Sequence, residues 1–346
     1  MKRLAYLDAL RGIAALLVVF THLYVPLIGH VWVLDYLIDP GKLGVLWFFM
    51  ISGVVIPFSL KPGPDGPKRF LISRFMRLYP AYWLSLLVFL VMLKLTSGVF
   101  PSWPQIVANL SMVQAALGFD DVIGLYWTLF IEVVFYALCL ALFVAGKLYD
   151  LTSRSRCALA FLLMALAMSM VRAVTERKLP VALPLALSLM FFGSIWRQWL
   201  LGEHSRQLTR NLLMLLGAFV VLLPPTLIMA YSKDMGTGET WGRYLFTYAV
   251  AIGSFLLLTR SVRLDHPLLV WLGAVSYSLY LLHPSMLMLS EFLLAPTGAP
   301  ALIVALFATL LTLGAAHLSF SLIETPFIQL GKRLNNRNAK TQPVSV

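Results

Sequence analysis

Ten runs of mostly apolar residues follow one another along this 346-residue sequence. Crossing the hydrocarbon core of a bilayer takes about 20 residues of helix, because each residue rises about 1.5 Å. Hydrophobic residues make up 60% of the chain and charged residues only 12%, which is more apolar than a soluble domain. We therefore expect an all-α, polytopic membrane protein with about ten transmembrane helices. The runs are 11–30, 41–60, 80–97, 126–145, 157–174, 181–197, 211–231, 241–260, 268–290 and 300–323.

The first run is similar to a secretory signal peptide, because a basic start precedes an apolar core. Asp8 and Arg11 lie near that core, and no small-x-small cleavage site follows. We interpret it as a retained first helix. The spans leave no soluble domain, so we expect residues 1–331 to form one transmembrane domain. Residues 332–346 are interpreted as a basic cytoplasmic tail without ordered structure.

The orientation follows from the distribution of Lys and Arg, which favour the cytoplasmic ends of spans. With the N-terminus inside, 20 of the 27 Lys and Arg residues lie on the inner side. An even number of spans then places both termini in the cytoplasm and the loop 98–125 outside. The basic residues fall in short clusters between apolar runs, which argues against a nucleic-acid partner.

His22 follows Arg11 by eleven positions in the first span. At 100° per residue they share one helical face, about 16 Å apart along the axis. Arg11 would lie at the inner edge and His22 deep in the membrane. A snorkelling arginine and a structural histidine would explain both residues, but ionisable groups inside a span are costly and usually functional.

Arg74 and Arg77 lie one helical turn apart at the start of the third span, in RFMRLYPAYW. Positive-inside anchoring would explain a basic residue here. Two arginines on one turn are also suited to gripping phosphate groups bidentately.

Three further ionisable side chains, in or at the edge of spans, could have a functional role. Glu132 lies in span 4 with Tyr136 one turn on, so a structural hydrogen bond is the alternative to a catalytic role. His283 lies in span 9 directly before Pro284, which frees a backbone carbonyl and is expected to kink the helix. Glu324 in span 10 precedes Pro326, which we expect to end the helix; a cap or a partner for an inner arginine is its simplest interpretation.

Other kinds of site find no support in the sequence. It contains no Walker loop, no dinucleotide-binding glycine motif, no nucleophile elbow and no H-x-x-x-H spacing, and we expect no metal. Cys139 and Cys157 lie in or beside apolar runs, where they are interpreted as small hydrophobic residues rather than disulfide partners.

Six segments, taken together, resemble the membrane-bound acyltransferase-3 family. The first span is similar to its Arg-x10-His motif, with Arg11 and His22 in place, although Ala9 stands where the family usually has glycine. RFMRLYPAYW is similar to its Arg-x-x-Arg helix start. The other landmarks are FFMISGVVI (48–56), YWTLFIEVVFY (126–136), SYSLYLLHP (276–284) and IETPF (323–327). The resemblance extends over about residues 4–330.

This resemblance implies transfer of an acyl group, often acetyl, from cytoplasmic acyl-CoA, the expected co-substrate. The acceptors would be hydroxyl groups of surface glycans, glycolipids, antibiotics or lipids, in a multi-pass protein of a bacterial inner membrane. Arg11, Arg74 and Arg77 would hold the CoA phosphates. His22 would act as general base or transient acyl carrier, and Glu132 would orient or polarise it. His283 would lie on the acceptor side.

Helical rise predicts that these groups form two layers. His22 lies about 16 Å above the inner edge, Glu132 about 21 Å and His283 about 22 Å, so the three share one level above the arginines. A transporter or flippase remains the alternative, because buried ionisable groups can also relay protons. The paired discontinuous helices or inverted repeat that would favour it are not evident. A purely structural scaffold would leave His22 and the inner arginine pair unexplained.

Overall fold

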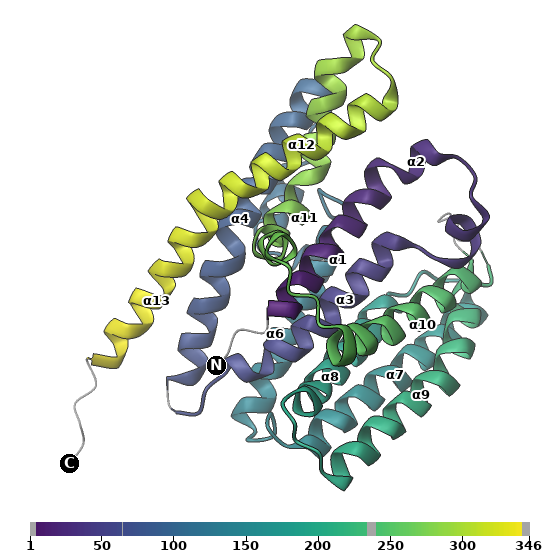
Figure 1. Ribbon diagram of the computed structural model, residues 1–346, viewed down its shortest axis with the longest axis vertical. Helices are drawn as coiled ribbons and strands as arrows, with labels where there is room; N and C mark the ends of the chain where they lie inside the picture. Colours follow the sequence, from purple (N-terminus) through teal and green to yellow (C-terminus); the bar gives the residue numbers. More distant parts are fainter. Residues whose placement is uncertain (1–4, 64, 234–239, 341–346) are drawn as a thin grey trace. The chain divides into compact units, whose positions relative to one another are not determined.

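The computed structural model describes residues 5–63, 65–233 and 240–340, which are helical with no strand (Figure 1). Nine of the described helices are long and apolar enough to cross a membrane. The expectation of an all-α polytopic membrane protein is thereby confirmed. The main helices are α1 (Ala5–Leu23), α3 (Pro40–Val55), α4 (Gly66–Thr96), α6 (Tyr126–Val144), α7 (Leu151–Thr175), α8 (Ala182–Leu200), α9 (Arg206–Tyr231), α10 (Trp241–Leu257), α11 (Pro267–Leu294), α12 (Ala301–Ser319) and α13 (Thr325–Lys340).

The chain folds into two compact units. Of the described residues, the first unit comprises 5–21, 28–58, 131–233 and 240–273. The second comprises 22–27, 59–63, 65–130 and 274–340. Helices α1, α6 and α11 each contribute residues to both units.

Helix α8 is the core of the first unit and packs against α3, α7 and α9. It corresponds to the run 181–197 and is not among the nine membrane-spanning candidates. Most of its residues are buried by neighbouring helices, including Ser188, Ser194 and Arg197. A helix enclosed by protein does not need a continuous apolar surface, which explains its lower hydropathy.

Two glycines allow the close approach of α3 and α8. A Cβ atom added to Gly53 would lie 1.9 Å from the Met190 carbonyl oxygen. A Cβ added to Gly193 would lie 2.2 Å from the Met50 carbonyl oxygen. Small residues at helix crossings are typical of membrane proteins. In lipid the hydrophobic effect does not drive helices together, so close packing of their backbones contributes the attraction instead.

Buried arginines in the first unit are structural. Arg154 Nη1 donates to the Ser194 carbonyl at 2.7 Å, and Arg197 Nη1 donates to the Val54 carbonyl at 2.9 Å. Both guanidinium groups also lie over the ring of Phe58, at 5.3 and 4.5 Å. Some of the basic residues that set the predicted orientation therefore also join helices together.

In the second unit, the long loop 98–125 carries a short helix, α5 (Trp103–Asn109), and a 3₁₀ turn, Gln114–Leu117. Side chains of α4 hold this loop. Tyr79 donates to the Ser111 carbonyl at 2.8 Å, and Trp83 donates to the Leu110 carbonyl at 3.0 Å. The loop thus packs along the side of α4.

The C-terminal part of the second unit differs from expectation. A π-helical turn, η6 (Phe320–Glu324), joins α12 to α13, and Pro326 lies in the first turn of α13. Proline is tolerated there because the first-turn N–H groups have no helical acceptor. The prediction that Pro326 ends the helix is therefore wrong. The expected unordered tail is helical as far as Lys340, and 341–346 lie outside the described residues.

Candidate active site

His22 and His283 lie together in the second unit. His22 Nδ1 is 3.2 Å from His283 Nε2, and the ring centroids are 5.0 Å apart with an angle of 38° between the rings. His283 is completely buried in α11, whereas His22, near the end of α1, is exposed. One imidazole is therefore accessible to substrates, and the other supports it from within the protein.

Pro284 creates the backbone acceptor that holds His283. A proline has no N–H, so the carbonyl four residues earlier, that of Tyr280, loses its helical donor. His283 Nδ1 lies 2.9 Å from this carbonyl oxygen. The carbonyl freed by Pro284, which the sequence predicted, is thus satisfied by the neighbouring histidine rather than left orphaned.

This contact determines where the protons lie in the neutral histidine pair. A carbonyl oxygen only accepts, so Nδ1 of His283 carries the hydrogen and its Nε2 is an acceptor. His22 Nδ1 must then donate to His283 Nε2. The second ring nitrogen of His22, Nε2, is left unprotonated, which is the form that a general base requires.

Tyr280, whose carbonyl holds His283, is itself anchored at the start of α6. Its hydroxyl lies 2.8 Å from Thr128 Oγ1 and donates to the Leu125 carbonyl at 3.2 Å. Thr128 was not among the residues predicted from the sequence. Its place in the YWTLFIE segment, one turn before Glu132, is the signal that could have found it.

A second polar cluster in this unit involves Glu324, which is buried and accepts a hydrogen bond from the Ser278 hydroxyl at 2.5 Å. Ser278 Oγ also lies 2.7 Å from the Ser319 hydroxyl oxygen. The hydrogen bond from Ser278 to Glu324 joins α11 to the π-helical turn η6. A cap role, or an arginine partner, for Glu324 stays a prediction. Sequence analysis singled out neither serine.

Glu132 lies in the first unit, where Tyr136, one turn on in α6, donates to its Oε1 at 2.5 Å. This hydrogen bond is made within α6. That Glu132 lies next to His22 stays a prediction.

The three arginines expected to bind CoA are distributed over both units. Arg11 belongs to the first, and Arg74 and Arg77 belong to the second. Arg74 lines a pocket of 470 Å³, with its guanidinium carbon 5.6 Å from the Phe70 ring centroid. Arg77 does not line this pocket. That Arg11, Arg74 and Arg77 bind the CoA phosphates together stays a prediction.

The comparison with protein families supplies the deciding observation. A family model described as an acyltransferase domain, Acyl_transf_3, matches residues 4–320, most of the chain. The chain belongs to the acyltransferase-3 family of membrane O-acyltransferases. No curated protein and no solved structure matches it.

Membership in the acyltransferase-3 family establishes an integral membrane acyltransferase in general terms. The matched segment includes both histidines and Pro284 and ends at the π-helical turn. Within the described residues, no group of three or more His, Cys, Asp or Glu side chains could hold a metal ion.

Proposed function

We propose that this acyltransferase transfers an acetyl group from cytoplasmic acetyl-CoA to a hydroxyl group of a surface glycan, glycolipid or similar acceptor. The observation that supports this proposal is the contact between His22 and His283, which leaves His22 Nε2 as a proton acceptor. O-acetylation needs such a base, because a neutral hydroxyl is a weak nucleophile. The host membrane would be a bacterial inner membrane.

In this reaction His22 Nε2 removes the proton of the acceptor hydroxyl while its oxygen attacks the thioester carbonyl. The new C–O bond forms, the tetrahedral intermediate collapses, and the C–S bond breaks to release the CoA thiolate. The imidazolium of His22 then returns its proton to the thiolate sulfur. His283 is a positioning residue, because its Nε2 holds the His22 ring by accepting a hydrogen bond from His22 Nδ1. His283 does not itself need to touch substrate.

The remaining predicted residues take supporting roles in this proposal. Glu132 would stabilise the imidazolium that forms on His22. Arg11, Arg74 and Arg77 would hold the CoA phosphates at the inner edge, because their planar guanidinium groups bind phosphate bidentately. Transfer through an acyl-histidine intermediate on the same Nε2 is the second mechanism that the geometry allows.

The test compares surface glycans and glycolipids from a deletion strain complemented with the wild-type protein or with His22→Ala. Wild type should restore O-acetyl groups detectable by mass spectrometry. His22→Ala, at equal membrane abundance, should not. Full restoration by His22→Ala would refute the proposed base. A proton-relay transporter would instead change the distribution of a substrate across the membrane without any mass change.

Purified protein distinguishes the two mechanisms. Brief incubation with radiolabelled acetyl-CoA and no acceptor should leave the protein unlabelled if transfer is direct. Label retained on wild type after denaturation, and absent from His22→Ala, would identify the acyl-histidine route.

A further inference from the structure

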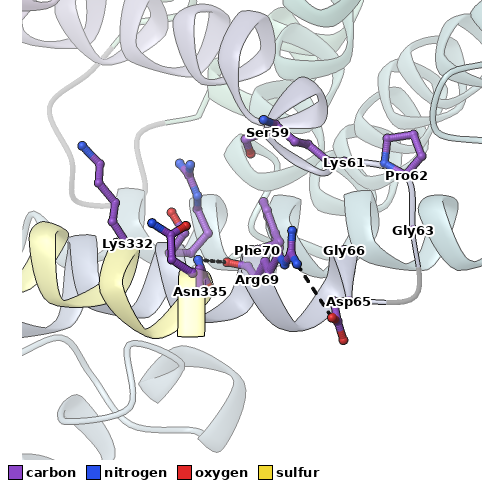
Figure 2. Close-up of a pocket in the computed structure, with 13 residues that line it drawn as sticks. Ser59, Lys61, Pro62, Gly63, Asp65, Gly66, Arg69, Phe70, Lys332 and Asn335 are labelled. Carbon is purple, nitrogen blue, oxygen red and sulfur yellow. Dashed lines mark hydrogen bonds and ion pairs between the residues drawn. The ribbon is translucent and has the colours of Figure 1, made fainter. Parts of the chain in front are cut away.

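A pocket of 470 Å³ lies at the start of α4, within the second unit (Figure 2). Figure 2 shows its three sides: the turn that carries Ser59 and Lys61, the first turns of α4 with Arg69 and Phe70, and α13 with Lys332. Pockets for small molecules occupy about 300–1,000 Å³, so this volume is sufficient for a ligand.

The pocket is strongly basic. Four of its lining residues are cations, Lys61, Arg69, Arg74 and Lys332, and Asp65 is its single carboxylate. Asp65 lies 3.8 Å from Arg69 in an exposed ion pair, which is worth little in water. The lining thus carries a formal net charge of +3. Such a site favours an anionic ligand.

Helix α13 is packed firmly against α4, so its cation is held at the pocket. A Cβ added to Gly331 would lie 3.1 Å from the Met76 Cβ, which shows how closely the helices approach. Asn335 Nδ2 donates to the Arg69 carbonyl at 3.2 Å. Lys332 lies between these two contacts. The side of the pocket formed by α13 lies beyond residue 320, where the family match ends.

We propose that this pocket binds a phosphate-bearing group and that Lys61 and Lys332 are its principal recognition residues. Lysine provides a point charge for phosphate, and the hydroxyls of Ser59 and Ser73 in the same lining can donate hydrogen bonds. The phosphate could belong to the nucleotide end of CoA, and that assignment rests on the proposed function. It could instead belong to an anionic phospholipid headgroup, and that assignment is independent of the proposed function.

The adjoining helix surfaces are consistent with either source. Leu71 and Phe75 of α4 and Leu330 of α13 are exposed large apolar side chains near the pocket-lining positions of these helices. They offer a surface for acyl chains of a membrane lipid or for the edge of the bilayer.

The test uses two double variants of the full-length protein. Lys61→Gln with Lys332→Gln removes two cations from the pocket. Lys68→Gln with Arg333→Gln removes two exposed cations from α4 and α13, outside the lining. The matched loss of charge separates a specific site from general surface attraction. Thermal unfolding verifies that both variants are folded.

Two probes distinguish the sources. Adenosine 3′,5′-bisphosphate binding is measured by calorimetry in detergent. Retention of phosphatidylglycerol over phosphatidylcholine is measured by native mass spectrometry. The pocket variant should bind one of the two probes about tenfold or more weakly than wild type does. The control variant should bind both probes within about twofold of wild type. Loss of the nucleotide identifies CoA, and loss of phosphatidylglycerol identifies a lipid.

Two results would overturn the proposal: equal weakening in both double variants, or no binding of either probe by wild type. His22→Ala serves as a further control, because it should bind both probes normally even though transfer is lost. Failure of the pocket proposal therefore leaves the proposed function intact, and retained transfer by His22→Ala would refute the function without affecting the pocket.

Discussion

His22 Nδ1 and His283 Nε2 lie 3.2 Å apart, although 260 residues separate them in the sequence. Because His283 Nδ1 is engaged with the Tyr280 carbonyl, the contact has one consistent pattern of hydrogens in the neutral state. The exposed histidine then presents an unprotonated nitrogen. The first two predictions test this relationship.

Replacing His283 should impair turnover more than substrate binding. His283→Ala removes the acceptor that fixes the His22 ring, so kcat should fall about 10- to 100-fold while KM for acyl-CoA changes little. His283→Gln keeps an acceptor oxygen on a side chain of similar length and should recover much of the loss. Equal kcat for the Ala and Gln variants would contradict a positioning role.

Restoring the N–H at position 284 should disturb the same histidine. Pro284→Ala supplies a helical donor to the Tyr280 carbonyl, which then competes with His283 Nδ1. One competing hydrogen bond of about 1 kcal/mol should lower kcat about fivefold. Pro224→Ala, inside α9 of the first unit, is the matched control and should leave kcat unchanged. A Pro284→Ala enzyme with wild-type kcat and an unaltered pH profile would refute this coupling.

The close contact of α3 with α8 should not tolerate a methyl group. Gly53→Ala or Gly193→Ala places a Cβ about 2 Å from a carbonyl oxygen of the facing helix. Each should destabilise the first unit by about 1–3 kcal/mol, measured by thermal unfolding in detergent. Gly217→Ala in α9, where a Cβ meets no atom within 4 Å, should be neutral or slightly stabilising. Similar Tm values for all three variants would disprove the close packing.

Asp39 should make stability depend on pH. Burial raises the pKa of Asp39, but Lys42 and Arg243, whose nitrogens lie 3.1 and 3.5 Å from its Oδ2, together with the backbone N–H of Lys42, lower it below its ordinary value overall. A depressed folded-state pKa stabilises above the unfolded value of about 3.9, and the effect is lost as pH falls through the folded-state pKa.

Asp39→Asn should therefore lower Tm at about pH 7, and the difference from wild type should shrink toward about pH 3. The exposed Asp265→Asn is the control and should match wild type at both pH values. A pH-independent difference for Asp39→Asn would assign the effect to the N-cap hydrogen bond that Asp39 accepts from Lys42 rather than to its charge.

The positive-inside orientation predicts which side of the membrane each segment faces. In a background with Cys139 and Cys157 replaced by serine, an impermeant thiol reagent added outside should label Ser102→Cys. It should not label Arg333→Cys, an exposed position of α13, until the membrane is opened. The reverse pattern would exclude a cytoplasmic donor at the basic pocket.

Local sequence patterns determined the parts of this protein that depend on short-range physics. Runs of apolar residues predicted the membrane-spanning helices, because the hydrocarbon core requires that length of each. Pro284 predicted a freed carbonyl, because the missing N–H always affects the residue four positions earlier. Helix ends were harder to predict. Pro326 lies in the first turn of α13 instead of ending a span, and a π-helical turn directly precedes α13.

Only the tertiary structure decided which distant residues meet. Depth arithmetic placed His22 and His283 at similar levels, but helical periodicity carries no information on which helices pack together. The side of α11 that carries His283 faces the end of α1, and the imidazole rings of His22 and His283 are therefore in contact. The basic pocket likewise joins Lys61 with Lys332 through packing of α13 on α4 at Gly331, which no local pattern encodes. Packing depends on complementary surfaces of segments far apart in the chain, so these sites emerge only once the chain is folded.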